Sequence, residues 1–486
     1  MGRTDREASS PAAPGALGAS GTHTGRRAPG GGGDAVAAER PPLLGRTGRV
    51  LRLLFPASEP PARRRTPGAV AWLVLANAAA IAAGAVILLE RQPGRPAWQD
   101  VGNEDYKFFL AGALAHPGSS LWTTYNGYLQ TLPRLIAEVV ARFPFRDADV
   151  GFAVAGAVTA SCCAVFVFHA SAGHIRTPAL RALLAVSVLL LPTALYEITN
   201  SDVNTIWYLL FATFWALLWR PRSRAGRVLA GLVCLLTALS NVLAIAYLPL
   251  VVARVVALPR VREQAATIGW VVGGALQVPA VLAAGRNNQN APLPGALGFY
   301  ARNVILAGVF GHHWAAVLTD AVGIVAATAI AGCIVAAVIT WACLRGGPRV
   351  RVFVLAALIT GFILTLLPVL VHGNVASPGE VRTLVFVHGS RYAQVPILIL
   401  YSLAIVTVDG FWRRPARHGR AAHGVAVVVL VAMLGTVWVS DYRFVNRRAS
   451  APAWSQIVSK FEAQCAHHPP QLTNLRENVS CWMLRR

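Results

Sequence analysis

Apolar runs of about 20 residues recur along this chain, and they constrain its fold more than any other feature. A hydrocarbon core of roughly 30 Å is crossed by a helix of about 20 apolar residues. Of the 486 residues, 55% are hydrophobic and 13% are charged, whereas a soluble chain carries about 25% charged residues. Because a backbone inside a bilayer must satisfy its own hydrogen bonds, each run is expected to be a helix. The sequence therefore predicts an all-α, polytopic membrane protein.

The position of the Arg clusters predicts the topology. The longest apolar stretch, 228–258, has Arg clusters at both ends, so we expect two short crossings with a break at Ser240–Asn241. Arg-rich inner turns favour a cytoplasmic N-terminus and an extracytoplasmic C-terminus. Without the break, the predicted membrane orientation of every later segment would be inverted. We expect about eleven spans, near 68–89, 150–170, 182–197, 205–219, 228–240, 241–258, 265–284, 318–343, 352–371, 392–410 and 421–439.

Three regions are expected. Residues 1–66 are rich in Gly, Pro, Ala and Arg, which predicts a disordered cytoplasmic tail. The transmembrane domain, 67–440, contains a long first outer loop, 90–149, whose amphipathic stretches near 104–115 and 127–143 should lie on the membrane surface. A further outer loop is expected from 286 to about 317. The extracytoplasmic tail, 441–486, is too short for a core of its own and should pack over the outer loops; there, oxidising conditions permit a Cys465–Cys481 disulfide.

The net charge of +23 is mainly a topology signal. Most Lys and Arg residues fall in segments assigned to the cytoplasm, with contact to anionic lipid as a second contribution. No folded basic module is visible, so a nucleic-acid partner is not expected. Only two of the 44 basic residues are Lys (Lys107 and Lys460), which is typical of a GC-rich bacterial genome such as an actinobacterial one. The expected location is a bacterial plasma membrane.

Acidic and aromatic residues gather in the first outer loop. Asp100, Glu104 and Asp105 follow the first span closely. Such carboxylates either bind a polar substrate beside the lipid head groups, or cap the helix that starts near Glu104. Both interpretations stay open, and a capping carboxylate can also be catalytic. Aromatic side chains suited to stacking and hydrogen bonding follow in the same loop: Trp122, Tyr125 and Tyr128.

Later outer segments add candidates for binding an anion or an acceptor. Arg391–Tyr392 opens a late span and is suited to a phosphate, although interfacial Arg and Tyr anchors are common. Arg302 and the pair His312–His313 are suited to phosphate or a metal, or are polar loop residues. The turn bracketed by Glu197 and Asp202 is suited to a polar ligand or a divalent cation, or is a solvated turn.

This arrangement resembles the GT-C superfamily of polytopic glycosyltransferases, which use polyprenyl-phosphate-linked sugars. The segment Asn103-Glu-Asp-Tyr106 resembles the acidic motif of that family, and 127–143 resembles its surface helix. Arg391–Tyr392 resembles the Arg-Tyr that begins a late span in many members. The Glu-Asp order differs from the Asp-Glu order of some branches, which leaves open whether Asp100, Glu104 or Asp105 matches the catalytic position.

The resemblance implies an inverting transfer of a sugar from polyprenyl phosphate to a cell-envelope glycan or lipid. Asp105 is our first choice as the general base, with Glu104 and Asp100 as alternatives. Arg391, Tyr392, Arg302, His312 and His313 would bind the donor phosphate. Glu197, Asp202, Trp122, Tyr125 and Tyr128 would bind the acceptor. No cofactor is assigned, and a divalent cation stays an open alternative. The competing hypotheses are a transporter or flippase of a lipid-linked glycan, and a scaffold without catalysis.

Overall fold

The computed structural model describes residues 42–57, 66–192, 198–284, 292–371, 389–411, 417–443, 451–467, 481 and 483–485. Helices dominate this part of the chain, and eight of them are long and apolar enough to cross a membrane. Shorter apolar helices lie among them. The prediction of an all-α, multi-pass membrane protein is therefore confirmed at this level.

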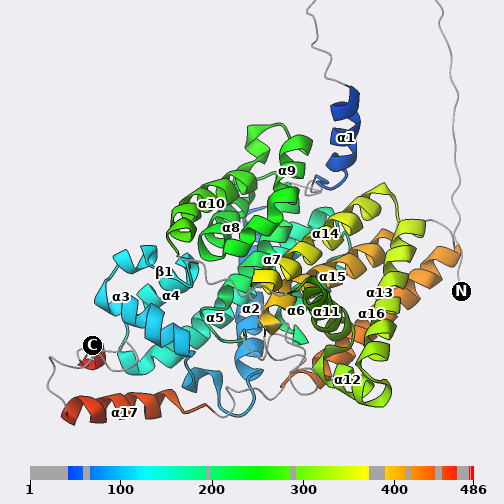
Figure 1. Ribbon diagram of the computed structural model, residues 1–486. Coiled ribbons are helices and arrows are strands. Elements are labelled where there is room, and N and C mark those ends of the chain that lie inside the picture. The colour runs from blue at the N-terminus through cyan, green and yellow to red at the C-terminus, as the bar shows by residue number, and fades with distance from the viewer. Residues whose placement is uncertain are drawn as a thin grey trace, which may run out of the picture.

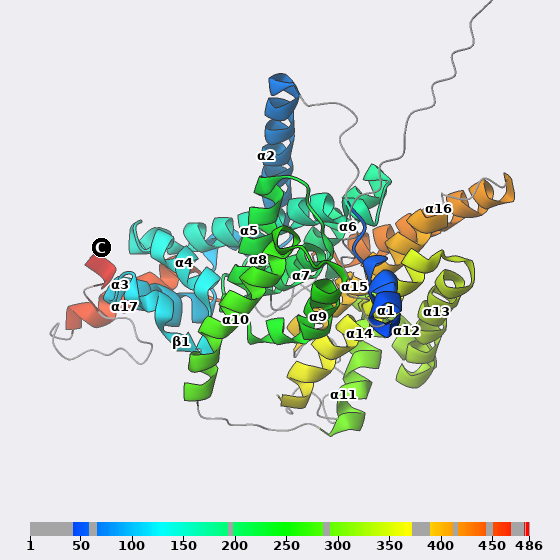
Figure 2. The ribbon, with the colours of Figure 1, turned by 90° about the horizontal axis from the view of Figure 1, so that it is seen from above.

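The order and arrangement of the long helices can be followed in Figures 1 and 2. Before the first loop come α1 (Pro42–Arg52) and α2 (Pro67–Glu90). After it come α5 (Ala148–Ala170), α6 (Pro178–Leu189), α7 (Thr205–Leu218), α8 (Arg224–Ser240), the 3-10 segment Val242–Tyr247, α9 (Leu248–Ala257), α10 (Ala265–Ala283), α11 (Leu293–Phe299), the π-helical segment Tyr300–Leu306, α12 (Ala307–Val322), α13 (Ile324–Arg345), α14 (Pro348–Val371), α15 (Ser390–Phe411) and α16 (Arg417–Ser440).

Helix α7 forms the centre of the bundle. Every one of its residues is buried, and α5, α8 and α15 pack around it. A helix that is apolar on all sides needs such a shell. Because neighbouring helices rather than lipid surround α7, its 14 residues can be shorter than a lipid-exposed span.

The predicted break at Ser240–Asn241 is confirmed. Helix α8 ends at Ser240, and Asn241 has an extended backbone with φ −147°. The Asn241 side chain accepts a hydrogen bond of 3.0 Å from the Leu243 N–H, which caps the next helical segment. After the break the chain continues through α9 to α10. There, a Cβ at Gly269 would lie 2.1 Å from the Gly231 carbonyl oxygen of α8, so only glycine permits this close packing.

The predicted outer loop over 286–317 is wrong for the residues that the structure describes. The chain is helical from Leu293 to Val322, and this run is a further candidate span by length and composition. Its polar residues, including Arg302 and His312, conceal the apolar pattern in the sequence. The run is bent at Gly311, whose φ of 71° and ψ of −168° suit glycine alone.

The first loop and the C-terminal tail form one small unit, which we call the loop domain: residues 97–147, 451–467, 481 and 483–485. It contains a π-helical segment (Asp105–Leu110), α3 (Ala111–Ala115), the hairpin β1 (Thr124–Tyr125) and β2 (Tyr128–Leu129), α4 (Thr131–Val140) and α17 (Trp454–His467). The helical stretch near 104–115 is confirmed. The expected helix over 127–143 is wrong at its start, because a hairpin occupies 124–129 and α4 begins at Thr131.

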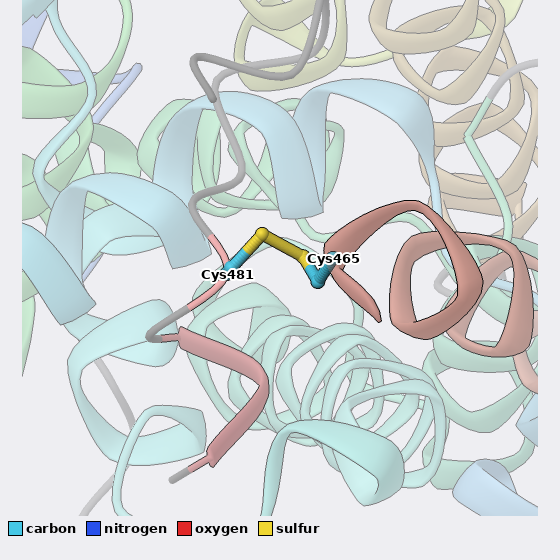
Figure 3. The surroundings of a disulfide bond; sticks show 2 residues. All are labelled: Cys465 and Cys481. Atoms are coloured by element: carbon cyan, nitrogen blue, oxygen red, sulfur yellow. A yellow bond between two sulfur atoms is a disulfide. The ribbon is translucent and has the colours of Figure 1, made fainter. Parts of the chain in front are cut away.

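The tail packs over the first loop, as predicted. Trp454 of α17 is fully buried, and its ring lies 5.2 Å from the Tyr106 ring and 5.1 Å from the Phe145 ring. The Trp454 indole N–H donates a 3.1 Å hydrogen bond to the Phe145 carbonyl. The Cys465–Cys481 disulfide is present and joins the end of α17 to the chain 16 residues later (Figure 3).

The predicted disorder of 1–66 does not hold for residues 42–57. Helix α1 packs beside α9 at the end of the molecule away from the loop domain (Figures 1 and 2). Leu54 and Phe55 are 2% and 1% exposed. Burial of each of these two side chains contributes roughly 1.5–3 kcal/mol to stability. The sequence did not indicate this, because two apolar residues hardly change the polar, Gly- and Pro-rich composition of the whole tail.

Candidate functional site

A two-strand hairpin places two tyrosines side by side. Asn126 and Gly127 have φ of 54° and 81°, as a tight hairpin turn of the Asn-Gly type requires. This turn pairs Tyr125 with Tyr128 across the strands. Gln277 of α10 fixes the hairpin, since its side chain accepts a 3.0 Å hydrogen bond from the Leu129 N–H and donates one of 3.3 Å to the Leu129 carbonyl.

Arg391, from the start of α15, lies within electrostatic range of both tyrosines. Burial raises the pKa of Tyr128, the Tyr392 phenol adds to this increase, and the Arg391 guanidinium opposes it. The guanidinium also lies 5.2 Å from the centre of the Tyr392 ring, and that ring packs edge-on against Trp207 of α7 at 5.6 Å. The structure therefore brings together Tyr125, Tyr128, Arg391 and Tyr392, which are far apart in the sequence.

Glu104 contributes negative charge to the same cluster. Burial raises the pKa of the Tyr125 phenol, and the Glu104 carboxylate is the next contributor to the increase. The Arg391 guanidinium lowers it, and the more weakly coupled Asp105 raises it. Glu104 is half-buried. A carboxylate, a guanidinium and two phenols thus share one partly solvated region at the edge of the loop domain, which we call the Glu104–Arg391 site.

Asp105 has a different environment from its neighbour. It is fully buried, and its two carboxylate oxygens accept hydrogen bonds of 3.1 Å and 2.9 Å from the backbone N–H groups of Asp202 and Val203. The Gly102 backbone allows this, because a Cβ there would lie 2.5 Å from an Asp105 oxygen. Asp105 therefore fastens the first loop to the turn that precedes α7, which is a positioning role.

Asp202 lies in that same turn, and its carboxyl group is fully buried. Neither of its oxygens has a hydrogen-bond partner among the described residues. Burial, and then the Asp105 carboxylate, raise the pKa of Asp202 well above its usual value. Glu197, the other predicted acid of this turn, lies outside the described residues. Asp100 is also buried, and it accepts a 3.3 Å hydrogen bond from the Gln92 side chain.

The remaining predicted residues have described contacts elsewhere. The Arg302 side chain donates to the Gly298 carbonyl of its own helical run at 3.1 Å. The backbone N–H groups of His312 and His313 donate to the two oxygens of Asp441 at 2.5 Å and 3.0 Å. Trp122 is 64% exposed on the loop domain.

An open cavity of about 690 Å³ lies between α12 and α16, lined in part by His313, Trp314, Thr436 and Ser440. It is separate from the Glu104–Arg391 site. Within the part of the chain that the structure describes, no group of three or more His, Cys, Asp or Glu side chains is placed to hold a metal ion.

Two features of the site were missed in the sequence. The Asn126–Gly127 pair signals a hairpin, and flanking alternation would have predicted that Tyr125 faces Tyr128. Gln277 has no local signal, because its role depends on a contact between α10 and a strand 148 residues earlier. The fold and the site together define a multi-pass α-helical membrane protein with a polar cluster at the edge of its loop domain. No protein-family model, curated protein or solved structure matches the chain.

Proposed function

We propose that this protein is a GT-C-like glycosyltransferase that moves a sugar from a polyprenyl-phosphate donor to a cell-envelope glycan or lipid. The observation that carries this proposal is the Glu104–Arg391 site: the paired tyrosines Tyr125 and Tyr128 both experience the Arg391 guanidinium, and Tyr125 also experiences the half-buried Glu104 carboxylate. These groups match the two needs of the reaction: a base for the acceptor and a cation for the leaving phosphate.

In the proposed reaction, Glu104 accepts the proton of the acceptor hydroxyl group. The acceptor oxygen forms a bond to the anomeric carbon, and the bond from that carbon to the phosphate oxygen breaks with inversion. The polyprenyl phosphate leaves as an anion that Arg391 stabilises. Tyr125 and Tyr128 stack against the sugar or bond to it. Glu104 is preferred to Asp105 as the base because Asp105 already accepts two backbone hydrogen bonds. Asp105 instead positions the loop.

The test is sugar transfer by purified protein in lipid nanodiscs, with a panel of labelled polyprenyl-phosphate sugars and a cell-envelope lipid extract. Glu104→Gln should lower transfer by roughly 10²–10⁴-fold with unchanged thermal stability. Asp105→Asn should lower both transfer and stability. The exposed loop carboxylate Asp147 provides the matched control, and Asp147→Asn should behave as wild type. If Asp105→Asn abolishes transfer at full stability while Glu104→Gln stays active, Asp105 is the base instead.

A second candidate, a transporter or flippase of a lipid-linked glycan, is favoured by one observation. Two apolar helical runs are interrupted, at Asn241 and at Gly311, and discontinuous helices are typical of transporter binding sites. If intact wild-type protein neither transfers nor hydrolyses any donor, but moves a labelled lipid-linked glycan across a vesicle membrane, this second function replaces the first. Activity in neither assay would favour a scaffold.

A further inference from the structure

The α9 region presents an apolar stripe with no partner among the described residues. Ile245, Leu248, Val252, Val255 and Val256 are each 41–53% exposed. At 100° per residue they fall within one narrow sector of the helix surface. In a multi-pass membrane protein, such a stripe faces lipid chains. It ends at Val256, so the boundary between lipid chains and head groups lies near that residue.

Exposed basic side chains begin where the stripe ends. Arg260 and Arg262 follow in the loop before α10, and Val261 between them is 76% exposed. Helix α1 is seated at the same level, since the Arg52 side chain donates a 3.1 Å hydrogen bond to the Ala257 carbonyl. We call the four exposed arginines of this region the basic collar: Arg49, Arg52, Arg260 and Arg262.

Among the described residues, the collar has no internal charge compensation. The segments 42–57 and 254–263 contain one acidic residue, Glu263. Its carboxylate is already paired with Arg220, which donates two hydrogen bonds of 3.0 Å and 2.7 Å from outside the collar. Arg254 is also outside it, since this buried guanidinium donates to the Trp219 carbonyl at 2.9 Å and the Glu263 carbonyl at 2.6 Å.

Helix α1 is held rigidly enough to present its charges. Leu54 and Phe55 are buried directly after it, and the buried Arg254 guanidinium lies 5.7 Å from the centre of the Phe55 ring. Gly48 lies against the Val256 carbonyl at the end of the stripe. Arg49 and Val50 point outward, and Val50 is 48% exposed. A short helix that presents basic and apolar side chains at this level fits a membrane surface.

We propose that the basic collar is a binding surface for anionic phospholipid head groups, with α1 lying on the membrane surface. The guanidinium groups supply charge and hydrogen-bond donors to the phosphates, and the exposed Val50 and Val261 enter the acyl boundary. This inference is independent of the proposed transferase activity.

The experiment uses full-length protein in nanodiscs that contain equal amounts of phosphatidylglycerol and phosphatidylcholine. Lipids retained by the protein after mild detergent release are counted by native mass spectrometry. Wild type should retain phosphatidylglycerol preferentially. In the combined Arg49→Gln, Arg260→Gln and Arg262→Gln variant, the ratio of retained phosphatidylglycerol to phosphatidylcholine should be roughly tenfold lower than in wild type. Arg52 is kept because it seats α1.

The matched control removes three other exposed arginines, as Arg142→Gln, Arg345→Gln and Arg349→Gln, and should retain the preference. An equal loss in this control, or wild-type retention in the collar variant, would overturn the proposal. A second measurement needs no variant: α1 amides of the wild type should exchange hydrogen more slowly in phosphatidylglycerol nanodiscs than in phosphatidylcholine nanodiscs. Equal exchange in the two lipids would also overturn it.

Discussion

Three buried aspartates each accept hydrogen bonds from two consecutive backbone N–H groups. Asp105 bonds to residues 202 and 203, Asp409 to residues 176 and 177, and Asp441 to residues 312 and 313. In each case the aspartate lies more than 90 residues from its two backbone donors in the sequence. A charge-assisted bond of this kind contributes roughly 1.5–3 kcal/mol. These carboxylates therefore join helices that no local sequence signal connects.

Asp202 is the contrasting residue, because its buried carboxyl group has no such partners among the described residues. Its folded-state pKa is raised above the unfolded value, so its contribution to stability is full at low pH and is lost as the pH rises from about 4 through the raised pKa. In that window the wild-type free energy of unfolding should fall by up to about 1.4 kcal/mol per pH unit.

Asp202→Asn should remove this part of the pH dependence and raise the melting temperature near neutral pH. Thermal unfolding of both proteins from pH 4 to pH 8 measures the effect, with Asp147→Asn as the exposed control. A melting temperature that responds to pH equally in wild type and Asp202→Asn would mean that Asp202 ionises freely in the folded protein.

At the scale of elements, the sequence predicted best what depends on local pattern. The apolar runs predicted α2, α5 and α10 nearly to the residue, and the Arg clusters predicted the break before α9. Residues 293–322 were missed because helical periodicity cannot be recognised where Arg and His interrupt an apolar run. The site was only half predictable. The acids and Arg391–Tyr392 could be recognised one by one, but their proximity depends on where the tertiary fold places the start of α15 relative to the hairpin.

Helix α17 is the element of the loop domain that covers the first loop, and Trp454 makes its main contacts. Trp454→Ala should lower the free energy of unfolding of the loop domain by about 3–5 kcal/mol, because a fully buried indole ring and its hydrogen bond to the Phe145 carbonyl are lost. Hydrogen exchange of amides in 105–115 should accelerate accordingly, while amides in α7 should not change. Trp122→Ala is the control, because Trp122 is exposed and its removal should change exchange little. Equal acceleration in both variants would show that α17 does not stabilise the first loop.

At the scale of the whole molecule, the two ends differ in chemistry. The loop domain carries the disulfide and Glu104, and α1 with the basic collar packs beside α9, apart from the loop domain (Figure 1). In the loop domain six acidic residues balance six basic ones, whereas the exposed charges around α1 and the loop before α10 are mainly arginines. Arginine-rich segments are typical of the cytoplasmic side. This asymmetry supports the proposed orientation, with the site outside the cell.

The orientation depends on whether the run Leu293–Val322 crosses the membrane. Along the antiparallel pair α14–α15, Gly361 faces Ile399. Near this same level, the Tyr300 ring packs against Phe362 at 5.4 Å, and the Tyr401 hydroxyl donates to the Gly308 carbonyl at 2.8 Å. Eight residues of a helix directed along the pair would rise about 12 Å. The segment therefore runs across α14–α15 rather than along them, and it bends at Gly311 before α13.

We therefore expect this run to enter the membrane without crossing it, which leaves the two termini on opposite sides. Protease added to intact spheroplasts should remove a C-terminal tag. An N-terminal tag should be removed only after the spheroplasts are permeabilised. If instead both tags respond alike, the run crosses completely and the termini share one side. In that case the loop domain keeps its side, because it precedes the run, but α17 would have to reach it from across the membrane. Because Trp454 packs against Tyr106, we expect an even number of crossings between these two residues. Tags that respond alike would contradict this expectation.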